Sequence, residues 1–180
     1  MKQLSTYLQE KLVINKDYNS SIKPKNFKAL RQIVEERYNK LGPGTEQKPI
    51  DFNDIDVSEI KSLGFGYRRG IFTKTNFEYI DISGWEIPKI YESMFYGCAE
   101  LKDVKLPSTI TRIDNCAFCH CKNLMSIYIN KNITYIDYGA FEYCESLKTI
   151  YVDDEESFDK IFFSNTVSDP RFYGGKLKKL

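Results

Sequence analysis

The sequence is poor in several features that would indicate a catalytic, membrane or nucleic-acid role. Its 180 residues contain one His and one Trp. No stretch approaches the roughly 18 consecutive apolar residues that a membrane span needs. The 26 Lys and Arg residues almost balance the 25 Asp and Glu residues, so the net charge of +1 provides no field toward nucleic acid or an anionic membrane. We therefore expect no membrane span and no nucleic-acid partner.

The first residues also lack the apolar core of a signal peptide, because polar side chains interrupt residues 1–11 throughout. The five cysteines are odd in number, and without an export signal they favour reduced thiols in a cytoplasm-like compartment. The spacing of the nucleophiles, bases and carboxylates in the sequence does not indicate any group of them that could act together in catalysis. We therefore expect no enzymatic activity and no cofactor.

The sequence does contain a repeat. Phe and Tyr are abundant, at 12 and 13 residues, and many apolar positions recur every 23 residues over about four and a half units. A fixed period of this length is typical of a solenoid, in which each unit buries its apolar side against its neighbours. The columns that we assign to the core are Phe95, Phe118 and Phe141; Cys98, Cys121 and Cys144; and Leu101, Leu124 and Leu147.

Each unit also contains a short alternating segment that predicts a strand. In residues 104–106, Val104 and Leu106 face inward and Lys105 faces outward, as in a half-buried strand. The same alternation occurs at residues 80–83 and, earlier, at residues 55–58. We therefore expect residues 55–58 to form the strand of the first unit.

The pattern A-F-x-x-C-x-x-L-x-x-I-x-(L/I/V), present at residues 117–129 and 140–152, resembles the BspA-like leucine-rich repeat. Residues 79–85, followed by Met94 and Phe95, resemble a related form of this repeat. The resemblance covers about residues 50–152. It implies an α/β repeat protein, a leucine-rich-repeat-type solenoid with short parallel strands. Members of the family occur in bacterial surface proteins and in some gut phages and protists, and they include adhesins and virion proteins.

We divide the chain into a leader with a short helix over residues 1–20, a capping helix and linker over 21–49, the solenoid over 50–152, and a C-terminal cap and tail over 153–180. An apolar stripe predicts the helix at residues 26–41, with Phe27 at its start and Leu41 at its end, and Gly42 stops it. This helix either covers the open N-terminal edge of the solenoid or docks a partner.

At the C-terminus, acidic residues 153–156 predict the start of a short capping helix. Phe158, Ile161 and Phe162 are then expected to close the other edge of the stack. We expect residues 176–180 to form a solvated tail, since three lysines are too few to indicate a nucleic-acid or lipid site.

One motif suggests a metal site. Residues 116–121 contain a CxxC pair, Cys116 and Cys119, beside His120, the only His. Thiolates and imidazole are good zinc ligands, but a strong zinc motif contains two such pairs. Cys121 already belongs to the core column, and a free Cys is a good small hydrophobe. We therefore interpret the cysteines as structural rather than as a metal or redox site, expect no metal, and regard His120 as an exposed bystander.

The remaining candidate is the exposed face of the strands. Stacking the units places Asp56, Asp81, Lys105, Tyr128 and Tyr151 in one outward column, and Asp54, Tyr79, Asp103, Ser126 and Thr149 in the next. These side chains either stabilise the sheet across strands or form a ligand surface. The candidates for such a surface are Tyr79, Asp81, Asp103, Lys105, Tyr128 and Tyr151.

Together these features predict a non-enzymatic recognition module that binds a protein or a glycan through the exposed strand face. The alternative is a structural or assembly subunit of a larger complex, for example a phage virion component attached through its N-terminal segment. In the absence of a signal peptide, we expect a cytoplasmic or virion-associated location.

Overall fold

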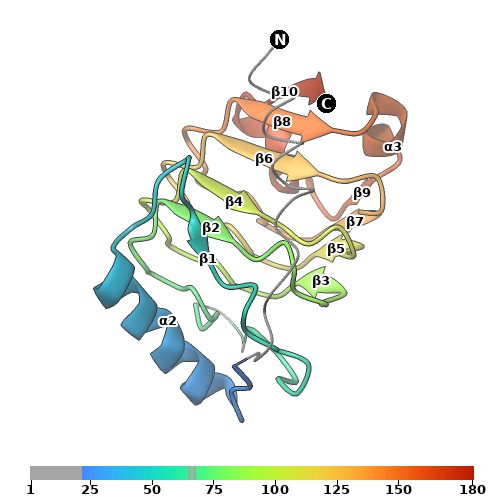
Figure 1. Ribbon diagram of the computed structural model, residues 1–180. Helices are drawn as coiled ribbons and strands as arrows, with labels where there is room; N and C mark the ends of the chain where they lie inside the picture. Colours follow the sequence, from blue (N-terminus) through green and yellow to red (C-terminus); the bar gives the residue numbers. More distant parts are fainter. Residues whose placement is uncertain (1–21, 65, 67) are drawn as a thin grey trace.

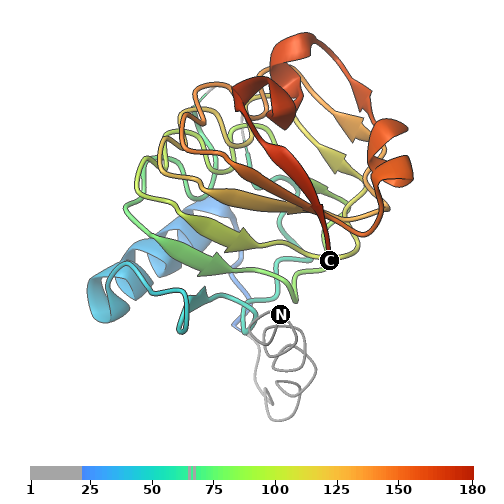
Figure 2. The same cartoon turned by 90° about the horizontal axis from the view of Figure 1, so that it is seen from above.

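The computed structural model describes residues 22–64, 66 and 68–180 (Figure 1). The helix expected in the leader, residues 1–20, lies outside this part of the chain. Short parallel strands of successive units line up in two rows, and Figure 2 shows the rows on separate sides of the molecule. The described chain is therefore a mixed α/β repeat fold with short parallel strands, as the sequence predicts.

The main row contains the strands that face the viewer in Figure 1. Strands β1, β2 and β4 pair in one sheet and β6, β8 and β10 in another. A backbone hydrogen bond of 3.1 Å from Met125 N to Lys102 O connects the two sheets. Ser126 of β6 pairs with Thr149 of β8, so the register here follows the 23-residue step. The bounds are Ile50–Asp51 (β1), Tyr79–Asp81 (β2), Asp103–Lys105 (β4), Ser126–Ile129 (β6), Thr149–Val152 (β8) and Lys176–Lys179 (β10).

The second row is a sheet of four strands among the described residues, in the order β3-β5-β7-β9. All of its neighbouring strands are parallel. Its bounds are Lys89–Ile90 (β3), Arg112–Ile113 (β5), Tyr135–Ile136 (β7) and Phe162–Phe163 (β9).

Stacked phenylalanines fill the core between the rows. The nearly parallel rings of Phe72, Phe95, Phe118 and Phe141 have successive centroid distances of 5.0, 5.0 and 5.4 Å. The column therefore continues one unit further toward the N-terminus than the three residues assigned to the core. Leu101, Leu124 and Leu147 are also fully buried.

The repeated cysteines form a second inward column, which we name the thiol ladder. Each buried thiol donates a hydrogen bond to a backbone carbonyl of the preceding unit. Each of these carbonyls also accepts a backbone N–H within its own turn, so the thiol adds a second, weak hydrogen bond while its small apolar side chain fills the core. The Sγ–O distances are 2.9 Å for Cys98 to Phe72, 3.1 Å for Cys121 to Phe95 and 3.2 Å for Cys144 to Phe118.

The helix α2 (Phe27–Leu41) lies beside β1 and β2 in Figure 1, at the N-terminal end of the main row. Asn26 caps its first turn, and Gly42 at φ 77° ends it. Leu30 and Val34 of its inner face are fully buried in the core. The predicted apolar stripe therefore packs inward.

Two arginines of α2 attach it to the repeat. Arg37 forms an ion pair of 2.6 Å with Asp54, and Arg31 donates a hydrogen bond of 2.7 Å to the carbonyl of Ile71. Leu41, the last residue of the predicted stripe, is 54% exposed, because the helix ends there.

The prediction that residues 55–58 form the first strand is wrong. The first strand is β1, whose Ile50 pairs with Ile80, a step of 30 residues that an insertion makes longer than the repeat. Ile55 forms only an isolated bridge with Ile22. Ile50 and Phe52 fill the core beside β2, and Ile55 and Val57 are also buried although they form no strand.

At the C-terminus the helix α3 (Glu155–Asp159) begins as predicted at the acidic run, with Asp154 as its cap. Phe158 and Ile161 are buried, but Phe162 is 62% exposed, so the prediction that it closes the stack is wrong. Phe162 lies in β9, where the neighbouring Phe163 turns toward the core instead.

The prediction of a solvated tail at residues 176–180 is also wrong. Strand β10 adds to the main row, with Leu177 beside Ile150 and Lys178 beside Tyr151. A short link of 3-10 helices, Thr166–Ser168 and Pro170–Tyr173, leads to it. Gly175 permits the close approach, since a Cβ there would lie 2.6 Å from a side-chain carbon of Ile150.

Candidate functional site

The strand face consists of the outward residues of the main row. Along each strand a buried residue alternates with one that is only half-buried, so the outward positions reach solvent. All six candidates from the sequence occupy outward positions. The register places Tyr79 beside Asp103, Asp81 beside Lys105, and Tyr128 beside Tyr151.

Asp81 and Lys105 form a largely buried ion pair. Their charged atoms lie 3.1 Å apart, and both side chains are less than one-fifth exposed. The Asp81 carboxylate also accepts hydrogen bonds from Ser83 and Asn53. Burial alone would raise the pKa of Asp81, but these hydrogen bonds and the charge of Lys105 outweigh it and lower the pKa. This pair therefore stabilises the sheet.

Tyr128 is held by a carboxylate of the loop after β8. Its hydroxyl donates a hydrogen bond of 2.7 Å to Asp153, whose other oxygen accepts one of 2.9 Å from the backbone of Lys131. Burial and this hydrogen bond raise the pKa of Tyr128 well above its usual value. The polar tip of Tyr128 is already satisfied, and its ring remains on the face.

Tyr151 lies beside a cation that the sequence pattern did not reveal. The Lys178 ammonium lies 5.5 Å from the centroid of the Tyr151 ring, within the range of a cation–π contact. Lys178 is exposed, and Tyr151 is half-buried. A half-buried aromatic ring and an exposed lysine therefore lie together at this end of the face.

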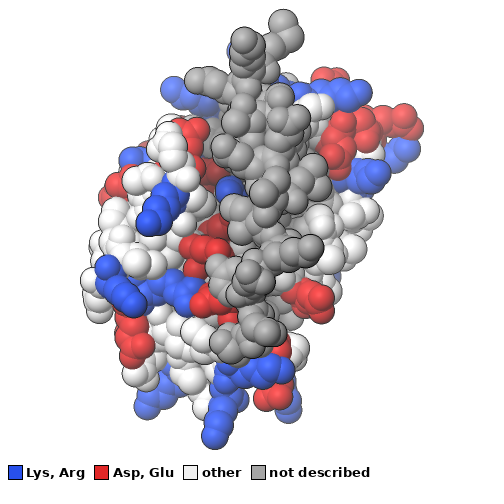
Figure 3. All heavy atoms as spheres, in the orientation of Figure 1, with Lys and Arg blue, Asp and Glu red and all other residues white. Residues whose placement is uncertain are grey.

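The other end of the face contains more ion pairs. Lys102 forms an ion pair of 2.5 Å with Glu78 and lies 5.9 Å from the Tyr79 ring. Ser126 donates a hydrogen bond of 3.4 Å to Asp103. Figure 3 shows basic and acidic side chains interspersed over the visible part of this side of the molecule.

The predicted columns need correction at the first unit. The register partner of Asp81 is Asp51, so Asp56 does not belong to this column. Asp56 forms an ion pair of 2.9 Å with Lys23, and Asp54 pairs with Arg37 of α2. Both carboxylates therefore attach segments that precede the repeat, and they contribute nothing to the strand face.

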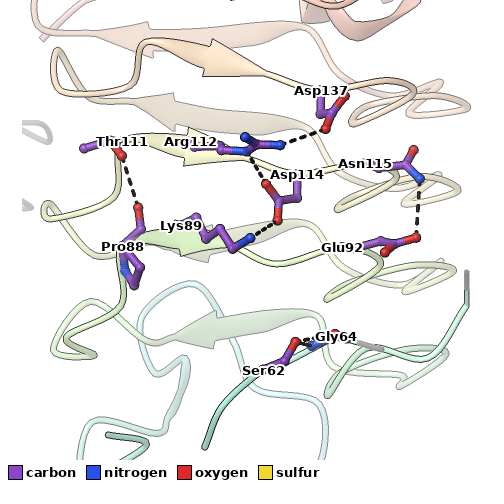
Figure 4. A network of polar contacts seen from close by, with 10 residues as sticks. All are labelled: Ser62, Gly64, Pro88, Lys89, Glu92, Thr111, Arg112, Asp114, Asn115 and Asp137. Carbon is purple, nitrogen blue, oxygen red and sulfur yellow. Dashed lines mark hydrogen bonds and ion pairs between the residues drawn. The ribbon is translucent and has the colours of Figure 1, made fainter. Parts of the chain in front are cut away.

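The second row carries its own outward column, and its charges are paired with one another (Figure 4). Asp114 accepts the ammonium of Lys89 at 2.6 Å and also pairs with Arg112, which reaches Asp137 at 3.0 Å. The Arg112 guanidinium lies 4.6 Å from the ring centroid of Tyr135. Ion pairs between its own side chains stabilise the second row, whereas the contact described at the Tyr151 end of the strand face is the cation–π contact with Lys178.

The predicted bystander His120 is in fact part of an aromatic row. Its ring stacks on Tyr143, with centroids 4.4 Å apart, and meets the edge of Tyr96 at 5.4 Å. Within residues 22–180, apart from 65 and 67, no group of three or more His, Cys, Asp or Glu side chains is placed to hold a metal ion. None of the helices in the same residues is long and apolar enough to cross a membrane.

Residues 67–171 match the model of the BspA type leucine-rich repeat region, in six copies. The match runs past residue 152, where the sequence resemblance ends, and so includes α3 and β9. Neither the curated proteins nor the solved structures contain a significant match.

Proposed function

The chain belongs to the BspA type leucine-rich repeat family, and we propose that its repeats form a capped solenoid that binds a protein partner through the strand face. Family membership points to a protein-interaction or recognition module, and repeats of this kind are generally non-enzymatic. In the proposed arrangement, α2 caps the N-terminal end, and α3 with β10 caps the C-terminal end.

One observation carries the proposal: the inward residues of the main row are similar from unit to unit, whereas its outward residues differ. The inward column that contains Ile150 holds Ile, Val or Leu in every paired strand, while the outward position changes from unit to unit. A fold requires the first pattern but not the second. The outward column runs Asp51, Asp81, Lys105, Tyr128, Tyr151 and Lys178.

The character of this column favours a protein over a glycan. Tyr is enriched in the centres of protein interfaces, and mixed charge around such a centre fixes the orientation of a partner. Tyr151 and Lys178 supply a ring and an exposed cation, while Asp81 and Lys105 supply a satisfied polar border. We therefore propose that contact centres on Tyr151 and that the acidic and basic residues select the partner.

Photocrosslinking tests the proposal even though the partner is unidentified. A benzophenone amino acid replaces Tyr151 in one variant and Tyr138, which is 56% exposed beside the second row, in a matched control. Both variants are irradiated in an extract of the cells that produce the protein. We expect a discrete protein adduct at position 151 that is absent at position 138.

Equal adducts at both positions, or none at position 151, would contradict the proposal. Deletion of residues 1–20 separates it from the assembly alternative. If that deletion abolishes incorporation into a complex while Tyr151→Ala does not, the N-terminal segment is the attachment point and the solenoid only carries it. Binding of the protein to a glycan array, if free sugar competes it away, would instead indicate a glycan ligand.

A further inference from the structure

Two of the five cysteines stand outside the thiol ladder. Cys116 and Cys119 form a small buried cluster with Tyr96 that is separate from the main core. The repeat does not require Cys at either position. Ser93 and Gly139 occupy the place of Cys116 in the neighbouring units, whereas Tyr96 and Glu142 occupy that of Cys119. The pair is therefore a feature of this unit alone.

The backbone brings the two side chains together. A hydrogen bond of 3.2 Å from Cys119 N to Cys116 O closes a four-residue turn. The Cα atoms at the ends of such a turn lie less than about 7 Å apart, and a disulfide needs about 4.4–6.8 Å. Cys116 has a positive φ of 52°, which matches 56° at Ser93 and 59° at Gly139. The repeat fixes this conformation, so the turn holds Cys116 in place.

The electrostatics divide the two thiols into unequal partners. A hydrogen bond from Cys119 lowers the pKa of Cys116. Burial and the charges of Glu142 and Glu92 oppose this effect, and the charge of Arg68 adds a smaller lowering. The same hydrogen bond and burial raise the pKa of Cys119. The thiolate is therefore more easily formed on Cys116, which also keeps 5% of its surface exposed, while the ladder cysteines are fully buried.

A metal explains the pair less well. Tetrahedral zinc requires four ligands, and three or more suitable side chains do not converge anywhere in the described ranges. Two thiols held at the ends of one four-residue turn, without further ligands, instead fit a dithiol that exchanges with disulfides.

We propose that Cys116 and Cys119 form a redox-active dithiol site whose substrate is a low-molecular-weight disulfide such as oxidised glutathione. The Cys116 thiolate attacks one sulfur of the disulfide, forming a mixed disulfide and releasing one thiolate. Cys119, after losing its proton to solvent, attacks the Cys116 sulfur and releases the second thiolate. The two cysteines are oxidised by two electrons, the external disulfide is reduced to two thiols, and the two protons end on these products.

Mass spectrometry of the folded, full-length protein after incubation with oxidised glutathione tests the site. We expect the wild type to lose the mass of two hydrogens, with the new bond mapped to the peptide that contains Cys116 and Cys119. Cys119→Ser should instead accumulate one glutathione adduct on Cys116, because the resolving thiol is gone. Cys116→Ser should form neither species.

The chain provides matched controls for this experiment. Ser occupies the equivalent of Cys116 in the preceding unit, so Cys116→Ser places a residue there that the turn already accommodates. Circular dichroism and an unchanged denaturation midpoint verify folding. Cys98→Ser and Cys144→Ser alter only the ladder. If these variants fold, their Cys116 and Cys119 should still be oxidised by glutathione disulfide.

Three results would overturn the proposal. The first is a folded wild type that stays fully reduced under conditions that oxidise a short CxxC peptide. The second is an equal reaction of the ladder cysteines. The third is an adduct on Cys119 in Cys116→Ser without one on Cys116 in Cys119→Ser, which would reverse the roles.

Discussion

The thiol ladder and the strand face run along the same units but follow opposite rules. Cys98, Cys121 and Cys144 repeat one residue and one hydrogen bond from unit to unit. Over the same units, the outward position changes from Lys105 to Tyr128 and then to Tyr151. A ladder position faces a backbone carbonyl of the preceding unit and therefore takes a small side chain with a donor. An outward position contacts its neighbours only through side-chain tips.

This difference separates what the fold needs from what a partner can use. Substitutions in the inward columns should alter stability in proportion to what they bury, and they should alter binding only through unfolding. Substitutions on the strand face should alter binding with little effect on stability. The following predictions test that separation, beginning with the largest expected change in the free energy of unfolding.

The stacked ring of Phe118 should show the largest effect. Phe118→Ala removes a fully buried ring that contacts Phe95 and Phe141 on its two faces. We expect the free energy of unfolding to fall by about 3–5 kcal/mol, measured by chemical denaturation. A loss below about 1 kcal/mol would show that the core does not depend on the stack.

The ladder should come next. Cys121→Ala removes a donor to the Phe95 carbonyl and leaves a small void. The Phe95 carbonyl keeps its hydrogen bond from Cys98 N, so we expect a loss of about 1–2 kcal/mol from the lost second bond and the void, measured in the same way. Cys121→Ser keeps a donor at nearly the same position and serves as the control. Equal stability of the Ala variant and the wild type would mean that the ladder bond contributes nothing.

The polar pair on the strand face should have a smaller, pH-dependent effect. The folded-state pKa of Asp81 is lowered, so its carboxylate stabilises the fold above the unfolded pKa of about 3.9, and this contribution is lost as the pH falls through the folded value. Asp81→Asn should therefore cost about 1 kcal/mol at pH 7. The difference from wild type should shrink in denaturation curves below about pH 4. A difference that is constant with pH would exclude the carboxylate charge as its cause.

The repeat could be predicted from the sequence because its signal is redundant. Phe95, Phe118 and Phe141 recur at the same step as the cysteines and leucines, and the structure stacks them at that step. The outward positions of the candidate residues followed from the alternation within each strand. These positions lie in units that have a neighbour on both sides, where packing demands the full apolar pattern.

The ends could not be predicted in the same way, because a terminal strand packs on one side only. Strand β10 places only Leu177 over the core, so its lysine-rich sequence indicated a tail. Lys178 was therefore not predicted to lie on the strand face. At the other end, an insertion shifts β1 out of step with β2. The hydrogen bond between Tyr128 and Asp153 could not be predicted either, because it joins a strand to a loop of the next unit. The position of Asp153 directly after the strand of Tyr151 was the one available signal.

The central claim, that the strand face near Tyr151 is the recognition surface, is tested most directly by one pair of variants. The dissociation constant of the partner found by crosslinking is measured for Tyr151→Ala and for Tyr138→Ala, each with its free energy of unfolding. We predict that Tyr151→Ala weakens binding by about 2 kcal/mol or more, roughly thirtyfold, and costs at most about 1 kcal/mol of stability. Tyr138→Ala should leave the dissociation constant unchanged. Equal binding by Tyr151→Ala and the wild type, or equal weakening by both variants, would contradict the claim.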